Sequence, residues 1–200
     1  RKYGVDVVRL WVASQDFRND IIVSEKRIEK VGETYRIIRN ALRYELSNLF
    51  DFDPAVHTVP DEQLTGLDAW VLDEFAGLEA DVLAAYDRHD FHVVYQKVSQ
   101  FVAVELSAIY HDVVKDRLYT DAANSPRRRS TQTALYHIVT TLCKMLDRET
   151  ATQVLWSDEG EVLLFVGQQK LGWSGSALAY VWDYVRGWLM MPPHLDTLAG

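Results

Sequence analysis

Apolar and polar residues alternate with a helical period most clearly between residues 24 and 49. Apolar side chains recur there every three or four positions and fall within about 80° of arc on a helical wheel. Ser24 is a plausible helix cap, and the run from Asp51 to Pro54 stops the pattern. The spacing predicts one long amphipathic helix with these core-facing residues: Ile28, Val31, Tyr35, Ile38, Leu42, Leu46 and Leu49.

Other segments show similar helical spacing, and one of them has a clear start signal. Ser125 followed by Pro126 is typical of a helix cap and a first helical residue. Amphipathic helices bury their apolar faces against one another, so we predict an all-α fold, a helical bundle. The further helices are expected over residues 5–13, 61–87, 91–119 with a bend or break near Asp112, and 126–146.

The pattern changes after Leu146. Residues 161–166 are rich in Val, Leu and Phe and end at Gly167, which is typical of a strand. A turn over 174–176 and a Trp-rich helix over 177–191 are expected to follow, so the C-terminal segment is predicted to be mixed. The domains expected are a connecting segment over 1–23, a helical domain over 24–156 and a C-terminal extension over 157–200.

The composition is that of a globular domain and excludes several other classes of protein. The chain has 200 residues, of which 48% are hydrophobic and 25% charged, as in ordinary globular domains. It contains no run of 18 apolar residues, and its single cysteine, Cys143, excludes an internal disulfide framework and Cys-rich zinc modules. We therefore expect a cytoplasmic protein without a membrane partner. The chain starts at Arg1 with no secretory signal pattern, so it is interpreted as a piece of something longer.

Charge is distributed in blocks along the chain. The formal net charge is −8, yet residues 1–50 carry 10 basic and 7 acidic side chains while residues 51–112 carry 2 and 13. Basic groups return over 113–129, with 5 basic against 2 acidic residues. Because charges are screened beyond roughly 10 Å at cellular ionic strength, a locally basic face can bind phosphate on an acidic protein.

The first basic group lies beside the apolar seam of the long helix. Arg36, Arg39 and Arg43 lie on one side of the helix, and Arg39 and Arg43 have no acidic residue three or four positions away. Glu105 is a possible internal partner for one of these arginines. It falls within the predicted apolar face of another helix, where a carboxylate needs a charged or hydrogen-bonding partner. We expect at most one of these two arginines to pair with Glu105.

The second basic group is Arg127, Arg128 and Arg129. Three cations in the first turn of a helix oppose the helix dipole, so they need either an external anion or a nearby acidic helix. With Lys115 and Arg117 they form a cluster suited to a nucleic-acid backbone. Reading an RNA loop also requires aromatic planes, for which Tyr44, Tyr119 and Tyr136 are available, although core packing is the more common role of such residues.

Two other classes of function are alternatives. His89, His92, His111 and Asp112 are residue types that bind a divalent metal, so a helical metal-dependent phosphohydrolase is one hypothesis. Asp116 and Asp121 are interpreted as surface charges, and Cys143 as a packing residue. An interaction module that uses the segment with Trp173, Trp182 and Trp188 is another hypothesis.

Several strings in the first 146 residues resemble one family in the right order. These strings include Tyr3-Gly-Val-Asp6, Asn48-Leu-Phe-Asp-Phe-Asp-Pro54, Phe91-His-Val-Val-Tyr95 and Asp112-Val-Val-Lys-Asp-Arg-Leu-Tyr-Thr120. They are similar to the segment after the KMSKS loop and to the anticodon-binding domain of isoleucyl-tRNA synthetases, which are class I aminoacyl-tRNA synthetases. Beyond Leu146 the similarity fades, because Asp147-Arg148-Glu149 replaces an apolar run of that family.

The resemblance implies a helical bundle that docks the anticodon stem-loop of isoleucine tRNA. The parent chain would be an isoleucine–tRNA ligase, with ATP bound in a catalytic domain that precedes Arg1, so this piece needs no cofactor and carries no catalytic residue. We expect a monomer. The candidate RNA contacts are Arg36, Arg39, Asn40, Arg43, Lys115, Arg117, Arg127, Arg128 and Arg129.

Overall fold

The structure is a computed structural model that describes residues 3–150, 153–156 and 162–165, with side chains for residues 3–146. Residues 1–167 form one compact unit, to which the following description applies. Its helices confirm the predicted all-α bundle. They are α1 (Val5–Ala13), α2 (Glu25–Asn48), α3 (Pro54–His57), the 3₁₀ turn η1 (Asp61–Gln63), α4 (Gly66–Asp87), α5 (Phe91–Phe101), the π-helical segment η2 (Val102–Tyr110), α6 (His111–Thr120) and α7 (Pro126–Thr150).

A two-stranded antiparallel hairpin follows the helices. It consists of β1 (Gln153–Trp156) and β2 (Val162–Phe165), and Gln153 lies opposite Phe165 in the register. The strand predicted over 161–166 is therefore confirmed. The turn predicted over 174–176 and the helix predicted over 177–191 lie outside the described residues.

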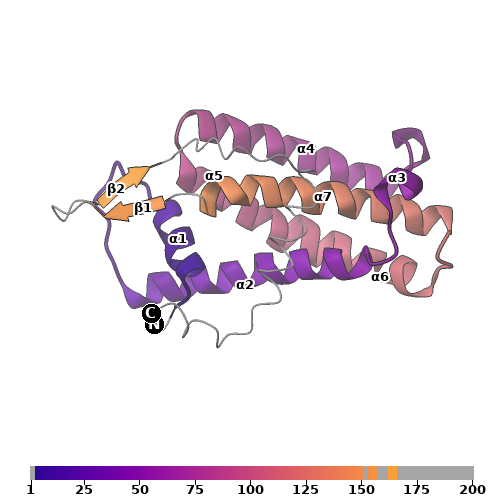
Figure 1. Ribbon diagram of the computed structural model, residues 1–200, viewed down its shortest axis with the longest axis horizontal. Helices are drawn as coiled ribbons and strands as arrows, with labels where there is room; N and C mark the ends of the chain where they lie inside the picture. Colours follow the sequence, from indigo (N-terminus) through magenta and orange to yellow (C-terminus); the bar gives the residue numbers. More distant parts are fainter. Residues whose placement is uncertain (1–2, 151–152, 157–161, 166–200) are drawn as a thin grey trace. The chain divides into compact units, whose positions relative to one another are not determined.

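Helix α7 is the central element of the bundle. It packs against α1, α2, α3, α4 and α6, and Figure 1 shows it running between α2 and α4. The apolar residues predicted for its inner face are buried, among them Leu135, Ile138 and Leu142 at 0% exposure. A helix packed on several sides needs an apolar surface wider than one stripe, and α7 has one.

The helix starts follow the local sequence signals closely. Ser24 has extended backbone angles and its hydroxyl accepts a hydrogen bond from the Arg27 amide, so it caps α2 as predicted. Helix α4 starts later than predicted, at Gly66 instead of Asp61, because residues 61–63 form the separate 3₁₀ turn η1. A short helix, α3, also forms in the segment predicted to be a loop; it is capped by the Asp53 carboxylate.

The long helical stretch from Phe91 to Thr120 contains the largest departure from prediction. Its irregular part is η2, a π-helical segment, whereas the predicted bend or break was near Asp112, where α6 simply continues. Buried residues recur along it at every fourth position. An α-helix overshoots a full turn by about 40° at that spacing, so a regular helix would wind this stripe away from the core. The buried series is Val94, Val98, Val102, Leu106, Tyr110, Val114 and Leu118.

The π-helical segment resolves this mismatch, since its i→i+5 hydrogen bonds hold more residues in each turn and rotate the stripe back. Residues 105 and 109 were predicted to lie on the core-facing side of this helix, and the π-helical segment turns them away from the core. Ile109 is 43% exposed, and Leu106 and Tyr110 occupy the core instead. Glu105 is half-buried, and no arginine pairs with it in the part of the chain that has described side chains. Neither Arg39 nor Arg43 is the partner of Glu105 among these residues, which agrees with the expectation of at most one such pair.

The turn between α4 and α5 places a histidine in a left-handed conformation. His89 has φ of 61°. The Asp90 amide donates to the Ala85 carbonyl and the His89 amide to the Tyr86 carbonyl, which is the Schellman arrangement that ends a helix. Glycine is the usual residue at this position, because a Cβ is disfavoured at positive φ. The structure therefore places His89 in the turn that ends α4, and this position requires no metal ion.

This geometry gives a prediction for stability. His89→Gly should raise the free energy of unfolding of the 200-residue chain by up to about 1 kcal/mol, because it removes the left-handed strain. Arg88→Gly is the matched control, since Arg88 has ordinary helical angles, and it should lower stability. Urea unfolding of the two variants measures both changes. A loss of stability for His89→Gly equal to that of Arg88→Gly would contradict the assignment.

Candidate nucleic-acid interface

The first turns of α7 hold six consecutive polar residues that are all buried. Residues 128–133 read Arg-Arg-Ser-Thr-Gln-Thr, and none is more than 8% exposed. Buried polar groups require hydrogen-bond partners, and buried cations require a carboxylate. The partners come from the end of α2 and from α4, so this run fixes one end of the bundle.

Asp51, in the turn after α2, is the first carboxylate partner. Arg128 donates to both of its oxygens, over 2.6 and 2.9 Å, in a bidentate pair, and the Gln132 amide donates over 2.8 Å. Arg129 donates to the Asp51 carbonyl and to the Asn124 side chain. The hydrogen bonds from Arg128 lower the pKa of Asp51 to about 2. An internal carboxylate, one of the two alternatives for this basic run, therefore pairs with Arg128 and, over 3.7 Å, with Arg129.

Asp68, near the start of α4, is the second carboxylate partner and is completely buried. It accepts hydrogen bonds from the Tyr110 hydroxyl over 2.7 Å and from the Ser130 hydroxyl over 2.5 Å. The Arg117 guanidinium lies 3.3 Å away and also donates to Thr65. Burial, with the Asp68 carboxylate as a further cause, raises the pKa of Tyr110 well above its ordinary value. One carboxylate thus joins α4, η2, α6 and α7.

Two further cations are exposed and paired with surface carboxylates. Lys115 lies 2.6 Å from Asp112, and Arg127 makes two hydrogen bonds to Asp121, of 2.8 and 2.6 Å. The pKa values of Asp112 and Asp121 are lowered by these hydrogen bonds. The five basic residues of 113–129 are therefore divided among four carboxylates and do not form one free basic cluster.

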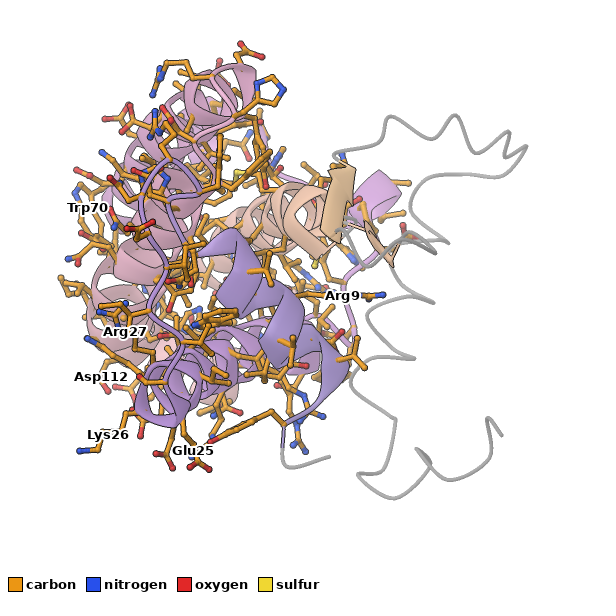
Figure 2. All side chains as sticks on the ribbon, turned by 90° about the vertical axis from the view of Figure 1, so that its left-hand side faces the viewer. Arg9, Glu25, Lys26, Arg27, Trp70 and Asp112 are labelled. Atoms are coloured by element: carbon orange, nitrogen blue, oxygen red, sulfur yellow. The ribbon has the colours of Figure 1, made fainter. Side chains whose placement is uncertain are left out.

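The basic residues of α2 have a different environment. Arg36, Asn40 and Arg43 are exposed and Arg39 is half-buried. Among residues 3–146, no carboxylate forms an ion pair with any of the three arginines. Figure 2 shows the opposite end of the same helix, where Glu25 and Lys26 point away from the bundle and carry charges of both signs. These three arginines without an ion pair among residues 3–146 lie between the middle of α2 and its C-terminal end.

A buried pair between α2 and α6 was missed by sequence reasoning. Glu45 is completely buried, and its Oε1 lies 3.3 Å from Nε2 of His111. Burial raises the pKa of Glu45 despite this contact. Glu45 lies three positions from the core residue Leu42, and Asp68 lies three positions from the core residue Val71. Each is therefore an acidic residue within an apolar stripe of its helix, and this pattern is the signal that could have identified them.

Of the three aromatic candidates, Tyr44 and Tyr119 interact with each other, and all three differ in their packing. The Tyr44 hydroxyl donates to the His111 carbonyl over 3.3 Å, and burial raises the pKa of Tyr44. Tyr136 packs against Phe52, with ring centroids 5.7 Å apart. Tyr119 remains 64% exposed.

The residues of the metal hypothesis do not gather into a site. His111 pairs with Glu45, Asp112 pairs with Lys115, and His89 lies in the turn after α4. Among the described residues, no three His, Cys, Asp or Glu side chains are grouped so that they could hold a metal ion. The geometry gives the phosphohydrolase hypothesis no support. No helix in the described part is both long and apolar enough to cross a bilayer.

The Asp51 pair gives a prediction for pH dependence. The folded-state pKa of about 2 lies below the ordinary value of 3.8, so ionised Asp51 stabilises the fold above pH 4 and this contribution is lost as pH falls towards 2. Asp51→Asn should lower the free energy of unfolding at pH 7 by about 2 kcal/mol, a difference that shrinks below pH 4.

Urea unfolding of the 200-residue chain at pH 7, 4 and 3 measures this effect. Asp112→Asn is the control, because its pair with Lys115 is exposed and screened, and it should change stability much less. Equal losses for the two variants at pH 7, or a loss for Asp51→Asn that is as large at pH 3 as at pH 7, would contradict the assignment.

Comparison with known proteins identifies the family. Residues 68–147 match the family described as the anticodon-binding domain of tRNA ligase. The chain is 45% identical over 143 residues to an isoleucine–tRNA ligase of Nitrosococcus oceani, which covers 72% of this chain and 15% of that protein. It is 47% identical over 158 residues to that of Moorella thermoacetica, covering 78% of this chain and 17% of the relative. The resemblance seen in the sequence is confirmed: over most of its length the chain is similar to a segment of isoleucine–tRNA ligases, and residues 68–147 match the anticodon-binding domain of tRNA ligases.

Proposed function

We propose that this domain docks the anticodon stem-loop of isoleucine tRNA through the exposed face of α2. The observation that carries the proposal is the pairing pattern of the cations. Arg36, Arg39 and Arg43 lack an ion-pair partner among residues 3–146, whereas Lys115, Arg117 and residues 127–129 each have one. Guanidinium groups without internal partners are available for phosphate, and Asn40 beside them can both donate and accept hydrogen bonds.

The paired cations have other roles in this proposal. Arg117, Arg128 and Arg129 hold the scaffold through Asp68 and Asp51. The side chains of Lys115 and Arg127 are 50% and 54% exposed, so each can exchange its surface carboxylate for an RNA phosphate and serve as a secondary contact. The α2 face then contributes the main share of the binding energy.

The chain spans 15–17% of the length of the relatives described above. We propose that the whole protein is an isoleucine–tRNA ligase that acts in the cytoplasm as a monomer. ATP-dependent aminoacylation would take place in a part of the protein outside this chain, and this domain would position the tRNA for it. Charging of isoleucine tRNA by the full-length protein with isoleucine and ATP tests this assignment, and failure to charge it would contradict it.

The α2 contacts are tested by substitution. Arg39→Ala and Arg43→Ala in the full-length protein should each weaken binding of an isoleucine tRNA anticodon stem-loop. The slope of log K against log salt should fall in magnitude by about 0.7–0.9 for each phosphate that the variant no longer binds. Thermal stability should change little, since these side chains form no ion pair with residues 3–146 that the substitution could remove. Binding is measured by titration at several salt concentrations.

The matched control is Arg88→Ala. Arg88 is an exposed arginine at the C-terminal end of α4, the opposite end of the bundle from Arg43, so its loss should leave binding unchanged. An unchanged salt slope together with a lowered melting temperature for Arg39→Ala and Arg43→Ala would show that the arginines are structural. Equal affinity for a non-cognate stem-loop would contradict the specificity for isoleucine tRNA.

A further inference from the structure

The exposed face of α2 continues past the end of the helix to an aromatic residue. Exposed side chains in its C-terminal half recur with spacings of four and three, at Arg36, Asn40, Arg43 and Ser47. The next position in this series is Phe50. The helix ends at Asn48, and Leu49 after it has φ of −103° and ψ of 9°, outside the helical region. Phe50 therefore lies in the turn that directly follows the row with the proposed phosphate contacts.

The Phe50 side chain is exposed to solvent although it is apolar. It is 80% exposed, the highest value for a large apolar side chain in the described part of the chain. Phe52, two residues later, packs against Tyr136 and His57, with ring centroids 5.7 and 6.0 Å apart. The turn thus packs one of its two phenylalanine rings against neighbouring rings and presents the other to solvent, at an apolar free-energy cost that an additional contact would recover.

The backbone on both sides of Phe50 is fixed by α7. The Gln132 amide donates to the Asn48 carbonyl over 2.9 Å, and the Asp51 carboxylate is held by Arg128. The Phe52 amide donates to the Leu49 carbonyl over 3.1 Å. Phe50 is therefore displayed from a turn that is ordered before any ligand binds, which lowers the entropy cost of a contact made there.

The combination of unpaired cations and an exposed ring matches the chemistry of single-stranded RNA. Phosphates of a loop pair with guanidinium groups, and its unstacked bases stack on aromatic side chains. Arg43 lies five positions before the end of α2, about 8 Å along the helix axis, and Phe50 lies two residues beyond that end, so phosphate and base contacts can be made by neighbouring parts of one RNA loop.

We propose that Phe50 is a base-stacking residue, on which one unpaired base of the bound RNA loop packs while the α2 arginines hold the phosphates. This inference rests on the proposed function of the α2 face. It adds a contact that charge cannot provide, because stacking is insensitive to salt. It also assigns a role in binding to the turn that Asp51 anchors.

The test uses Phe50→Ala, Phe50→Leu and Phe50→Trp in the full-length protein, with the anticodon stem-loop of isoleucine tRNA as the probe. Phe50→Ala should weaken binding about 5- to 150-fold, the usual range for one stacked base, with an unchanged salt slope. Phe50→Leu should fail to restore affinity although it is apolar, and Phe50→Trp should restore it. Phe17→Ala, which removes a 59% exposed ring from the segment before α2, is the matched control and should have no effect.

A second measurement identifies the base. Stem-loops with an abasic nucleotide at each loop position in turn are titrated against the wild type and Phe50→Ala. One position should weaken wild-type binding but cause no further weakening in Phe50→Ala, because both changes remove the same contact. Coupling at no position, or restored affinity in Phe50→Leu, would overturn the inference.

These measurements distinguish a failure of the Phe50 inference from a failure of the proposed function. If Arg39→Ala and Arg43→Ala weaken binding while Phe50→Ala does not, the α2 face binds RNA and Phe50 takes no part in it. If the wild-type protein does not bind the stem-loop, the proposed function fails as well. A lowered melting temperature for Phe50→Ala with unchanged RNA affinity would show that Phe50 packs against another part of the protein, which also overturns the inference.

Discussion

The structure depends on how the polar run at the start of α7 is neutralised inside the bundle. Residues 128–133 are buried, and two carboxylates from distant parts of the chain, Asp51 and Asp68, accept hydrogen bonds from most of them. Breaking a buried pair by removing one partner costs far more than the pair contributes, because a charge is left without compensation. The positions of α2, α4 and α6 at this end of the bundle therefore follow from the same set of hydrogen bonds.

This internal neutralisation decides where positive charge remains on the surface. Three adjacent arginines at a helix start suggest a phosphate site, yet Arg128 and Arg129 face inward and Arg127 is paired with Asp121. The arginines of α2 have no such partner within residues 3–146. The anchoring of Asp51 also orders the turn that displays Phe50, so the scaffold and the proposed RNA face share one group.

The π-helical segment η2 has a comparable effect on packing. Between Phe91 and Thr120 the core residues recur every four positions, and a change of helical winding keeps them on one side. Tyr110 and His111 thereby reach Asp68 and Glu45, the buried carboxylates of the neighbouring helices. Without the added residue per turn, Ile109 would take a core position and these hydrogen bonds would not form.

The sequence by itself determined the long helices, the Ser24 cap, the strand at 162–165 and the family resemblance, because all of these depend on neighbouring residues or on ordered local strings. It did not determine which arginines are free. Arg128 and Asp51 are 77 positions apart, and Arg117 and Asp68 are 49 apart, so only the packed helices bring them together. The face of residues 102–110 was also beyond sequence reasoning, since a helical wheel assumes one constant winding and the tertiary packing selects another.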